Sequence, residues 1–567
     1  MGNHVSKNIV VLAIIVFVAF FLRIYKIDAN PPALSWDEVS IGYNAYSILK
    51  TTKDEHGRFL PLDTFIAYGD YKPPVPIYIT LPFVAFFGLN EFAVRIPSAL
   101  FGTLTVLLTY FLVKQLFSQK CTNLTTHNSP ARNATHSVAG GQLTTLPIFS
   151  SALLALSPWH INLSRAGFEA NIALFFVVLG VFVILKAIQR PILLIGAWIP
   201  FVVAIYTFNS SRYFVPLLSV GLLFFVWDVI KKNIRYFAIG ICIVCILFIP
   251  IVPHMLSKEA RLRFTEVNIF SDPEVVMVSN TRIEEAGNVW WAKIFFNRRL
   301  GYARSYVLHF LDHFQPEYLF IKGDGNPKFS IQDVGQMYIF EAPFLAIGVL
   351  SMLVRYPSIG ILLLYWMIMA VVPAAVARET PHALRTLNSL PTWQIFTAFG
   401  MLTIVSSFKF QVSRIYNKKF IIFFSLIVVF YMFSVMYYLH NYYQHYPKEF
   451  SGEWQYGYKQ ALAFIRPIEK NYDAIYMTES IGRPYMYTLF YNKIDPQEFF
   501  KMKNSSFDAA GFYHVYGFGK YHFTSDMPES CPGKCLYITT AGADMKKHSL
   551  LFSVFMLNGN PILDIYE

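Results

Sequence analysis

The chain has 567 residues, of which 55% are hydrophobic and only 14% are charged, whereas soluble domains average roughly 25% charged residues. This composition excludes a soluble globular enzyme and a disordered chain. The 47 basic and 35 acidic residues give a net charge of +12, which fits nucleic acid or an anionic membrane until the excess is located along the chain.

Apolar runs long enough to cross a bilayer recur from the N-terminus to residue 439. A helix rises about 1.5 Å per residue, so about 20 apolar residues cross roughly 30 Å of hydrocarbon. The first run resembles the core of a signal peptide, but Arg23 and Lys26 follow it instead of small residues, so we expect it to stay as an anchor. The sequence predicts eleven spans, near residues 8–25, 92–117, 143–158, 169–188, 192–209, 213–229, 235–253, 337–354, 357–376, 391–408 and 419–439.

The proline-rich segment 73–88 decides the topology, because a further span there would reverse the side of every later loop. Its length of about 24 Å as a helix is short of a crossing. If it does not cross, the loops on the side of the N-terminus hold 14 basic residues and one acid, Asp228. Basic residues gather in cytoplasmic loops. The charge excess is therefore explained by topology, and we expect no nucleic-acid partner.

This topology predicts a polytopic helical membrane protein with three long extracytoplasmic segments, residues 26–91, 254–336 and 440–567. The last segment alternates short β-rich runs (DAIYMT, HVYGF, LYITT) with one helical stretch. That pattern predicts a small α/β domain. We therefore expect a transmembrane catalytic domain over residues 1–439 and an extracytoplasmic α/β domain over residues 440–567.

Two smaller features depend on the same topology. Cys531 and Cys535 would lie in an oxidising compartment and are close enough in sequence to form a disulfide. The N-x-T triplets at Asn123 and Asn133 would face the cytoplasm, where they are not glycosylated, so we interpret them as chance occurrences.

Four clusters of ionisable and polar residues lie at the outer ends of the predicted spans, where such residues are costly and mark functional candidates. Each also has a structural interpretation: an acid can favour the first turn of a helix, a lysine can extend to the membrane interface, and Arg165 and Glu169 can pair on one helix face. The clusters are Asp37 and Glu38; Asp70, Tyr71 and Lys72; His160, Arg165 and Glu169; and Tyr206, Asn209, Arg212 and Tyr213 with His382 and Arg385.

Together the clusters place carboxylates and cations on one face of the membrane. A carboxylate can accept the proton of an acceptor hydroxyl, and Lys or Arg can hold the phosphate of a lipid-linked donor. The pattern favours group transfer from a lipid phosphate. A transporter or flippase of a lipid-linked or anionic solute is the alternative, although transporters place charges near the membrane midplane, often between repeated halves. A receptor that acts through its C-terminal domain would leave the cluster at Asp37 unexplained.

The motifs WDE, DYKPP, EFAVRIPSALFG, SPWHINLSR and HALRTL resemble those of glycosyltransferase family 39. This group of GT-C membrane enzymes includes protein O-mannosyltransferases and lipid A aminoarabinose transferase, and the resemblance covers roughly residues 8–400. It implies a GT-C fold and transfer of a hexosyl or pentosyl group, with inversion, from a polyprenyl-phosphate sugar to an acceptor hydroxyl. The reaction is expected at the extracytoplasmic face of the plasma membrane.

The resemblance also implies roles for single residues: Asp37 as the catalytic base or the carboxylate that orients the acceptor, Glu38 as its partner and Lys72 as a ligand of the lipid phosphate. We expect no cofactor and no metal, because the leaving group is a single phosphate. The expected partners are membrane lipid, the polyprenyl-phosphate-linked sugar and a lipid, glycan or protein acceptor. Further phosphate ligands are expected at Arg165, Arg212 and Arg385, and substrate-binding residues at Asp70, Tyr71, His160, Glu169, Tyr206 and His382.

Two features depart from the protein O-mannosyltransferases. Lys72-Pro73-Pro74 stands where those enzymes have a histidine-led HPP motif, and is closer to the aminoarabinose transferase. The segment 254–336 is also too short for their luminal β-trefoil insert. The sugar and the acceptor therefore stay open.

Overall fold

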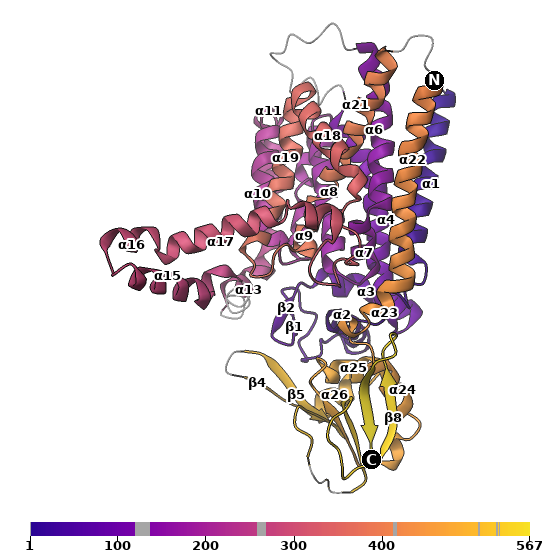
Figure 1. Cartoon of the computed structure of the whole chain (residues 1–567), viewed down its shortest axis with the longest axis vertical. Helices are drawn as coiled ribbons and strands as arrows, with labels where there is room; N and C mark the ends of the chain where they lie inside the picture. Colours follow the sequence, from indigo (N-terminus) through magenta and orange to yellow (C-terminus); the bar gives the residue numbers. More distant parts are fainter. Residues whose placement is uncertain are drawn as a thin grey trace.

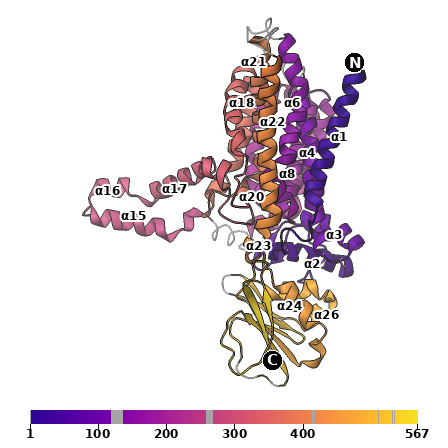
Figure 2. The same cartoon turned by 45° about the vertical axis from the view of Figure 1, so that its right-hand side comes forward.

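The computed structural model describes residues 2–118, 136–257, 268–411, 417–508, 511–528, 531 and 533–567, so Cys121, Asn123 and Asn133 lie outside the described residues. The described chain forms an upright helical bundle, with the N-terminus at one end and a C-terminal sheet domain at the other (Figure 1). A helical hairpin projects sideways from the bundle (Figures 1 and 2).

Each of the eleven predicted apolar runs coincides with helical structure. Six helical segments of the described chain are long and apolar enough to cross a membrane, at α1, α4, α8, α12 to α13, α19 and α22. Other runs give shorter helices: Pro200 and Pro253 lie in the first turns of α9 and α13, where a missing N–H is tolerated. The bundle helices are α1 (Gly2–Ile24), α4 (Glu91–Leu116), α6 (His136–Leu156), α8 (Glu169–Ala187), α9 (Ile199–Ile205), α10 (Ser211–Phe225), α11 (Trp227–Lys232), α12 (Ile234–Phe248), α13 (Val252–Leu256), α18 (Ala342–Arg355), α19 (Pro357–Val371), α21 (Thr392–Gln411) and α22 (Asn417–His440).

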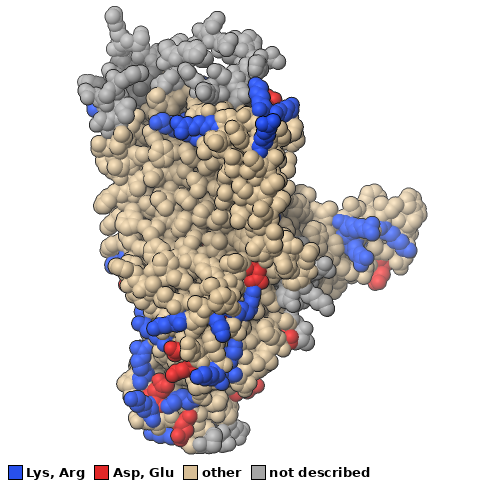
Figure 3. Space-filling model, turned by 180° about the vertical axis from the view of Figure 1, so that it is seen from behind, with Lys and Arg blue, Asp and Glu red and all other residues tan. Residues whose placement is uncertain are grey.

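The outer helices leave large apolar side chains uncovered. Phe17 of α1, Ile246 of α12 and Phe433 of α22 are 68%, 63% and 68% exposed. An exposed apolar surface of this extent is stable only in contact with lipid. Figure 3 shows the same surface as a broad belt with almost no charged residues between two charged ends. The protein is therefore an integral membrane protein.

The two ends of the belt differ in charge. The end that carries the N-terminus is largely basic on the face seen in Figure 3, whereas the opposite end mixes acidic and basic residues. Helix α11, with Lys231 and Lys232, lies at the basic end (Figure 1). This is the asymmetry that the predicted topology requires.

The first long connection folds at the end opposite the N-terminus, as α2 (Trp36–Thr51), β1 (Phe65–Ala67), β2 (Asp70–Lys72) and α3 (Val75–Phe87). Ser35 begins α2 with a capping box, in which its hydroxyl accepts from the Glu38 N–H and the Glu38 carboxylate accepts from the Ser35 N–H. The 13-residue helix α3 packs against α2 at the base of the bundle (Figures 1 and 2). The segment 73–88 is thus too short to cross, as predicted.

The predicted extracytoplasmic segment 254–336 contains the lateral hairpin. Its helices are α15 (Pro273–Glu285), α16 (Trp290–Phe295) and α17 (Arg298–Asp312). Three short helices complete the base of the bundle: α7 (Pro158–Arg165), α20 (Ala383–Thr386) and α23 (Tyr446–Glu449).

The C-terminal region forms a seven-stranded mixed sheet in the order β4-β5-β6-β3-β7-β9-β8, in which β3 runs parallel to β6 and β7. The predicted α/β fold is confirmed, and Cys531 and Cys535 form a disulfide. The elements are α24 (Tyr458–Ile465), α25 (Pro484–Tyr491), α26 (Pro496–Met502), β3 (Ala474–Thr478), β4 (Asn504–Phe507), β5 (Tyr513–Phe518), β6 (Tyr521–Thr524), β7 (Cys535–Thr540), β8 (Leu550–Phe555) and β9 (Pro561–Tyr566).

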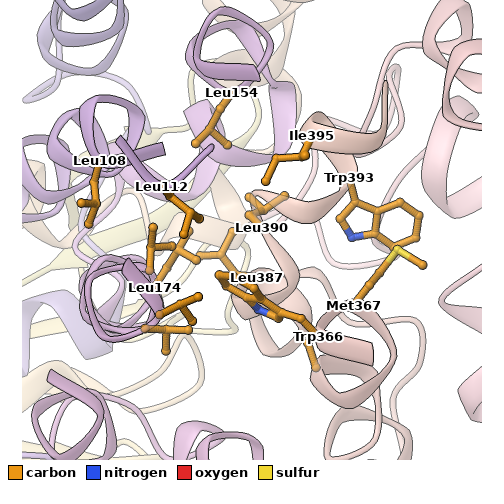
Figure 4. Packing of buried hydrophobic residues seen from close by; sticks show 14 of the residues in the cluster. Leu108, Leu112, Leu154, Leu174, Trp366, Met367, Leu387, Leu390, Trp393 and Ile395 are labelled. Carbon is orange, nitrogen blue, oxygen red and sulfur yellow. The ribbon is translucent and has the colours of Figure 1, made fainter. Parts of the chain in front are cut away.

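The bundle has its own apolar core, in which leucines of α4, α6 and α8 meet tryptophans of α19 and α21 (Figure 4). Three indole N–H groups in this core fix the segment that follows α19. Trp159 donates to the Ala383 carbonyl at 3.0 Å, and Trp366 donates to the Asn388 carbonyl at 2.7 Å. Trp393 donates to the Ser389 hydroxyl at 2.8 Å. Because its backbone is held in this way, the segment presents its side chains at fixed positions.

A second apolar core joins the first connection to the C-terminal sheet. Leu34 and Ile41 share one buried cluster with Met486 and Phe490 of α25. The hydroxyl of Tyr487 also donates to the Leu34 carbonyl at 3.0 Å. The C-terminal domain is therefore packed directly against the turn that carries Asp37.

Candidate active site

A cavity of about 1270 Å³ lies between the base of the bundle and the C-terminal domain. Its wall is formed by the first connection, the starts of α8 and α10, residues 326–329, the segment 372–385 and loops of the C-terminal sheet. Most of its charged lining comes from segments outside the bundle helices, with Glu169 and Arg212 in the first turns of α8 and α10. The cavity is thus located where several distant parts of the chain meet.

Lys72 is the centre of an ion cluster on this wall. Its ammonium nitrogen lies 2.9 Å from Asp37 Oδ1, 3.0 Å from Asp70 Oδ2 and 3.7 Å from Glu169 Oε1. The β1–β2 hairpin places Asp70 and Lys72, α2 places Asp37 in its first turn, and α8 places Glu169 in its own. We call these four residues the Lys72 cluster. It unites four of the predicted site residues.

The electrostatics of the Lys72 cluster keep the lysine charged. Burial by itself lowers the pKa of Lys72, but the carboxylates of Asp37, Asp70 and Glu169 outweigh burial and hold that pKa well above its ordinary value. The Asp37 side chain is 33% exposed, whereas Lys72 is almost covered. The carboxylate that a substrate can reach is therefore oriented by a buried cation.

Glu38 does not line the cavity. Its Oε1 accepts from Arg95 Nε and from the Gly167 N–H, both at 2.8 Å, and its Oε2 accepts from the Ser35 N–H at 2.9 Å. Both side chains of the pair are fully buried. Arg95 also donates to the carbonyls of Ile27, Pro31 and Ala33. We call this group the Arg95 cluster. Glu38 links α2 to α4 instead of facing a substrate.

Arg165 is also outside the cavity. Its guanidinium is fully buried and donates to the carbonyls of Leu22, Tyr25 and Asn30 at 2.7 to 2.8 Å, and to the Tyr442 hydroxyl at 3.1 Å. Its N–H donors are thus used inside the protein, and they join helix α7 to the turn that follows α1. The structure does not bring Arg165 to the expected phosphate site.

His160 and Tyr206 also remain apart from the cavity lining. His160 is fully buried, with its Nδ1 2.7 Å from Arg23 Nη2. The Tyr206 hydroxyl donates to the Leu247 carbonyl at 2.8 Å. Both side chains support the packing of helices, and neither reaches the space beside Asp37.

Besides Lys72, the predicted cations that line the cavity are Arg212 and Arg385. Arg212 lies in the first turn of α10, and its buried Nε and Nη2 have no hydrogen-bond partner in the described protein. A buried guanidinium without partners is costly, so this position favours an anionic ligand.

His382 lines the same wall as Arg385. Its ring stacks on Phe329, with 4.9 Å between the ring centroids. Burial, Arg385 and His313 together lower the pKa of His382 well below its ordinary value. A neutral imidazole here can accept or donate a hydrogen bond to a sugar hydroxyl. The predicted residues Tyr71, Asn209 and Tyr213 line the cavity as well.

Two cations on the wall are not found from sequence patterns. Lys328 Nζ lies 4.7 Å from the centre of the Trp36 ring, and burial lowers the pKa of this lysine while Asp37 opposes the change. Arg483, in the turn before α25, lies over the ring of Tyr68 at 5.3 Å. Nearly 300 and 450 residues separate them from Asp37, so no local spacing could have assigned them to its site.

With this geometry described, comparisons with solved structures define the fold. The chain resembles the crystal structure of ArnT from Cupriavidus metallidurans bound to undecaprenyl phosphate, with 12% identity over 99% of this chain and 98% of ArnT and a TM-score of 0.52. For ArnT in the apo state the TM-score is 0.53, with the same identity and coverage. The fold is therefore that of the GT-C membrane glycosyltransferases.

The family comparison is more local. Residues 13–127 match the family model of dolichyl-phosphate-mannose-protein mannosyltransferase, which confirms the resemblance found in the N-terminal motifs. The archaeal oligosaccharyltransferase AglB from Archaeoglobus fulgidus, in complex with an inhibitory peptide and a dolichol-phosphate, matches with 13% identity over 86% of this chain and 64% of AglB, at a TM-score of 0.47. No curated protein sequence matches the chain.

Proposed function

We propose that this protein transfers a sugar from a polyprenyl-phosphate-linked donor to an acceptor hydroxyl, with inversion at the anomeric carbon. The observation that carries the proposal is the partly exposed Asp37 carboxylate, held at 2.9 Å by Lys72 on the wall of the cavity. The ArnT structure with undecaprenyl phosphate supports a polyprenyl carrier.

In the proposed reaction the acceptor hydroxyl lies against Asp37 and gives its proton to the second carboxylate oxygen. The acceptor oxygen forms a bond to the anomeric carbon from the side opposite the phosphate. The bond between that carbon and the phosphate oxygen breaks, and its electron pair leaves with the lipid phosphate. Lys72 fixes the orientation of Asp37, which limits the motion needed before proton transfer.

The cations of the wall are suited to the leaving phosphate. Arg212 has two buried nitrogens without partners, and a guanidinium binds phosphate through two parallel hydrogen bonds. Lys72 has three N–H groups, of which two point to oxygens at 2.9 and 3.0 Å. Glu169 Oε1, at 3.7 Å, is beyond hydrogen-bond distance, so we assign the third N–H to the phosphate. Arg385 and Lys328 add positive charge to the same cavity.

No metal or other cofactor is proposed. The charge on Asp37, Asp70 and Glu169 is already opposed by Lys72, and the developing charge on a single phosphate can be met by fixed arginines. Among the described residues no group of three or more His, Cys, Asp or Glu side chains is placed to hold a metal ion. The expected independence from metal rests on these fixed cations.

We place the cavity on the extracytoplasmic side of the plasma membrane. The support is the basic end opposite the cavity (Figure 3), because basic ends face the cytoplasm. Residues 1–439 would then form the catalytic domain and residues 440–567 an extracytoplasmic domain. Reporter fusions near Arg132 and Asn504 should report opposite sides of the membrane, and the same side for both would contradict the arrangement.

The test of the activity is direct. The protein, purified and reconstituted in lipid, is incubated with radiolabelled polyprenyl-phosphate hexoses and pentoses and a panel of lipid, glycan and peptide acceptors. We expect a covalent labelled product with at least one donor and release of lipid phosphate, both absent in the Asp37→Asn variant. Movement of donor across the bilayer without any covalent product would favour the flippase alternative.

A further inference from the structure

The lateral hairpin of α15, α16 and α17, which we call the arm, has no part in the proposed chemistry. It leaves the bundle near the edge of the charge-free belt and runs sideways (Figures 1 and 3). No residue of its longest helix, α17, is buried. A helix pair without a packed outer face requires a partner beyond the described protein.

The exposed apolar residues of α17 recur at helical spacing. Leu300, Val307, Leu308 and Leu311 are between 48% and 53% exposed. Their separations of seven, eight and eleven residues put them on one face of the helix. Helix α17 therefore has an apolar stripe on one face, interrupted by Arg304 four residues after Leu300.

The tip of the arm is aromatic. Trp290 is 75% exposed and Phe295 is 69% exposed, with Trp291 and Ile294 beside them. Tryptophan side chains prefer the headgroup level of a bilayer, where one part of the ring is apolar and the N–H remains solvated. This tip has the composition of an interfacial anchor.

The positive charge of the arm lies beyond α15, although residues 273–312 as a whole hold five basic and four acidic residues. Between Ala286 and Leu311 there are four basic residues and no acidic residue. A cationic helix with an apolar stripe and exposed tryptophans is typical of segments that lie in the plane of a membrane surface. The basic residues are Lys293, Arg298, Arg299 and Arg304.

The arm keeps a defined shape. The Ser279 hydroxyl donates to the Phe296 carbonyl, and the rings of Phe270 and Tyr302 meet with 5.9 Å between their centroids. Asn297 caps α17 by accepting from the Arg299 N–H at 2.9 Å. The exposed residues are thus displayed by a closed hairpin.

The root of the arm is attached to the wall of the cavity. His309 Nδ1 lies 2.9 Å from the Ala377 carbonyl, and the Thr380 hydroxyl donates to Asp312 at 2.8 Å. The His382 N–H donates to His313 Nε2 at 3.1 Å. Ala377 and His382 both line the cavity.

We propose that the arm lies on the bilayer surface on the cavity side and binds anionic lipid headgroups. The tip tryptophans enter the headgroup layer, the stripe of α17 faces the acyl chains, and the four basic residues contact lipid phosphates. The arm thereby fixes the height of the cavity wall relative to the membrane surface. This proposal does not depend on the reaction performed in the cavity.

The test uses the full chain in nanodiscs, with Cys121, Cys242 and Cys245 replaced by alanine. A polarity-sensitive fluorophore is attached to Trp290→Cys and quenched by spin-labelled lipid or by aqueous iodide. The lipid-facing control is Ile246→Cys in α12 and the water-facing control is Leu557→Cys in the C-terminal domain. We expect the label at position 290 to be quenched severalfold more by the lipid quencher than the label at 557, and to be shielded from iodide.

The charge component is tested in the same system. Adding phosphatidylglycerol to phosphatidylcholine nanodiscs should increase the shielding at position 290, and the triple variant R298Q/R299Q/R304Q should lose that increase. Iodide quenching at 290 equal to that at 557 would overturn the proposal. Shielding that appears only in nanodiscs with two copies would also overturn it, because a second chain would then be the partner.

Discussion

The Lys72 cluster and the Arg95 cluster both begin in the first turn of α2, but one faces a cavity and the other is sealed. In the Lys72 cluster Asp37 keeps a third of its side-chain surface exposed. In the Arg95 cluster Glu38 and Arg95 are fully buried, and both carboxylate oxygens of Glu38 accept hydrogen bonds from the protein. A charge with solvent access can exchange its partner for a substrate, whereas a fully satisfied buried pair cannot do so without unfolding.

The comparison also separates the arginines. Arg165 resembles Arg95, because backbone carbonyls accept from its guanidinium inside the protein. Arg212 resembles the Lys72 cluster, because it lines the cavity with two nitrogens that lack partners. An arginine whose N–H groups all donate to the protein is therefore structural, whereas one with N–H groups that lack partners is available to a ligand.

The largest effect is expected for Asp37→Asn. The amide keeps the shape of the side chain but cannot accept the acceptor proton, and loss of a general base typically costs about 10² to 10⁴ in rate. Initial rates of sugar transfer by reconstituted variant and wild type measure the loss. Retention of more than half of the activity would transfer the role of base to Asp70 or Glu169.

Glu38→Gln should damage the fold more than the chemistry. It leaves the buried Arg95 guanidinium without a counter-charge, and breaking a buried pair costs about 3–5 kcal/mol. Thermal unfolding in detergent should show a lower Tm, with partial recovery in the double variant Glu38→Gln/Arg95→Gln. A variant with normal Tm but no transfer would instead identify Glu38 as a direct participant.

Lys72→Ala should raise the donor KM. A hydrogen bond to a charged group contributes about 1.5–3 kcal/mol, so loss of its phosphate contact should weaken donor use by roughly 10- to 100-fold. Transfer rates measured across donor concentrations separate KM from kcat. A lower kcat with unchanged donor KM would show that Lys72 only positions Asp37.

Arg212→Gln should weaken donor use by about tenfold, at the lower end of that range, because Arg385 and Lys328 remain in the cavity. The matched variant is Arg165→Gln, which should lower Tm without a selective rise in donor KM. Donor titrations and unfolding of both variants measure the difference. Equal donor KM in the two variants would remove Arg212 from the phosphate site.

The smallest effect is expected for chelation. If Lys72 and the arginines supply the positive charge, excess EDTA should leave the transfer rate of the wild type unchanged. The control is the same assay with added Mg²⁺ or Mn²⁺. A loss of activity that metal restores would show that the carboxylates of the Lys72 cluster hold a cation during the reaction.

The sequence by itself determined the membrane class, the positions of the apolar runs and the α/β nature of the C-terminal region. These features follow from local composition and periodicity, which a single stretch of chain displays. It also determined that Asp37, Asp70, Lys72 and Glu169 are candidates, because charged residues beside apolar runs are conspicuous. The disulfide between Cys531 and Cys535 followed from their short spacing together with the oxidising compartment that the predicted topology gives them.

Tertiary structure alone decided which charges share a site. Asp37 and Glu38 are adjacent in sequence, but successive helical residues point about 100° apart, so their partners depend on which helices pack against α2. The same packing assigned Arg165 to backbone carbonyls and brought Lys328 and Arg483 to the cavity wall. Ion pairing and burial are set by segments that lie from 35 to more than 400 residues apart. The sequence could therefore indicate candidate residues but not decide which of them share a site.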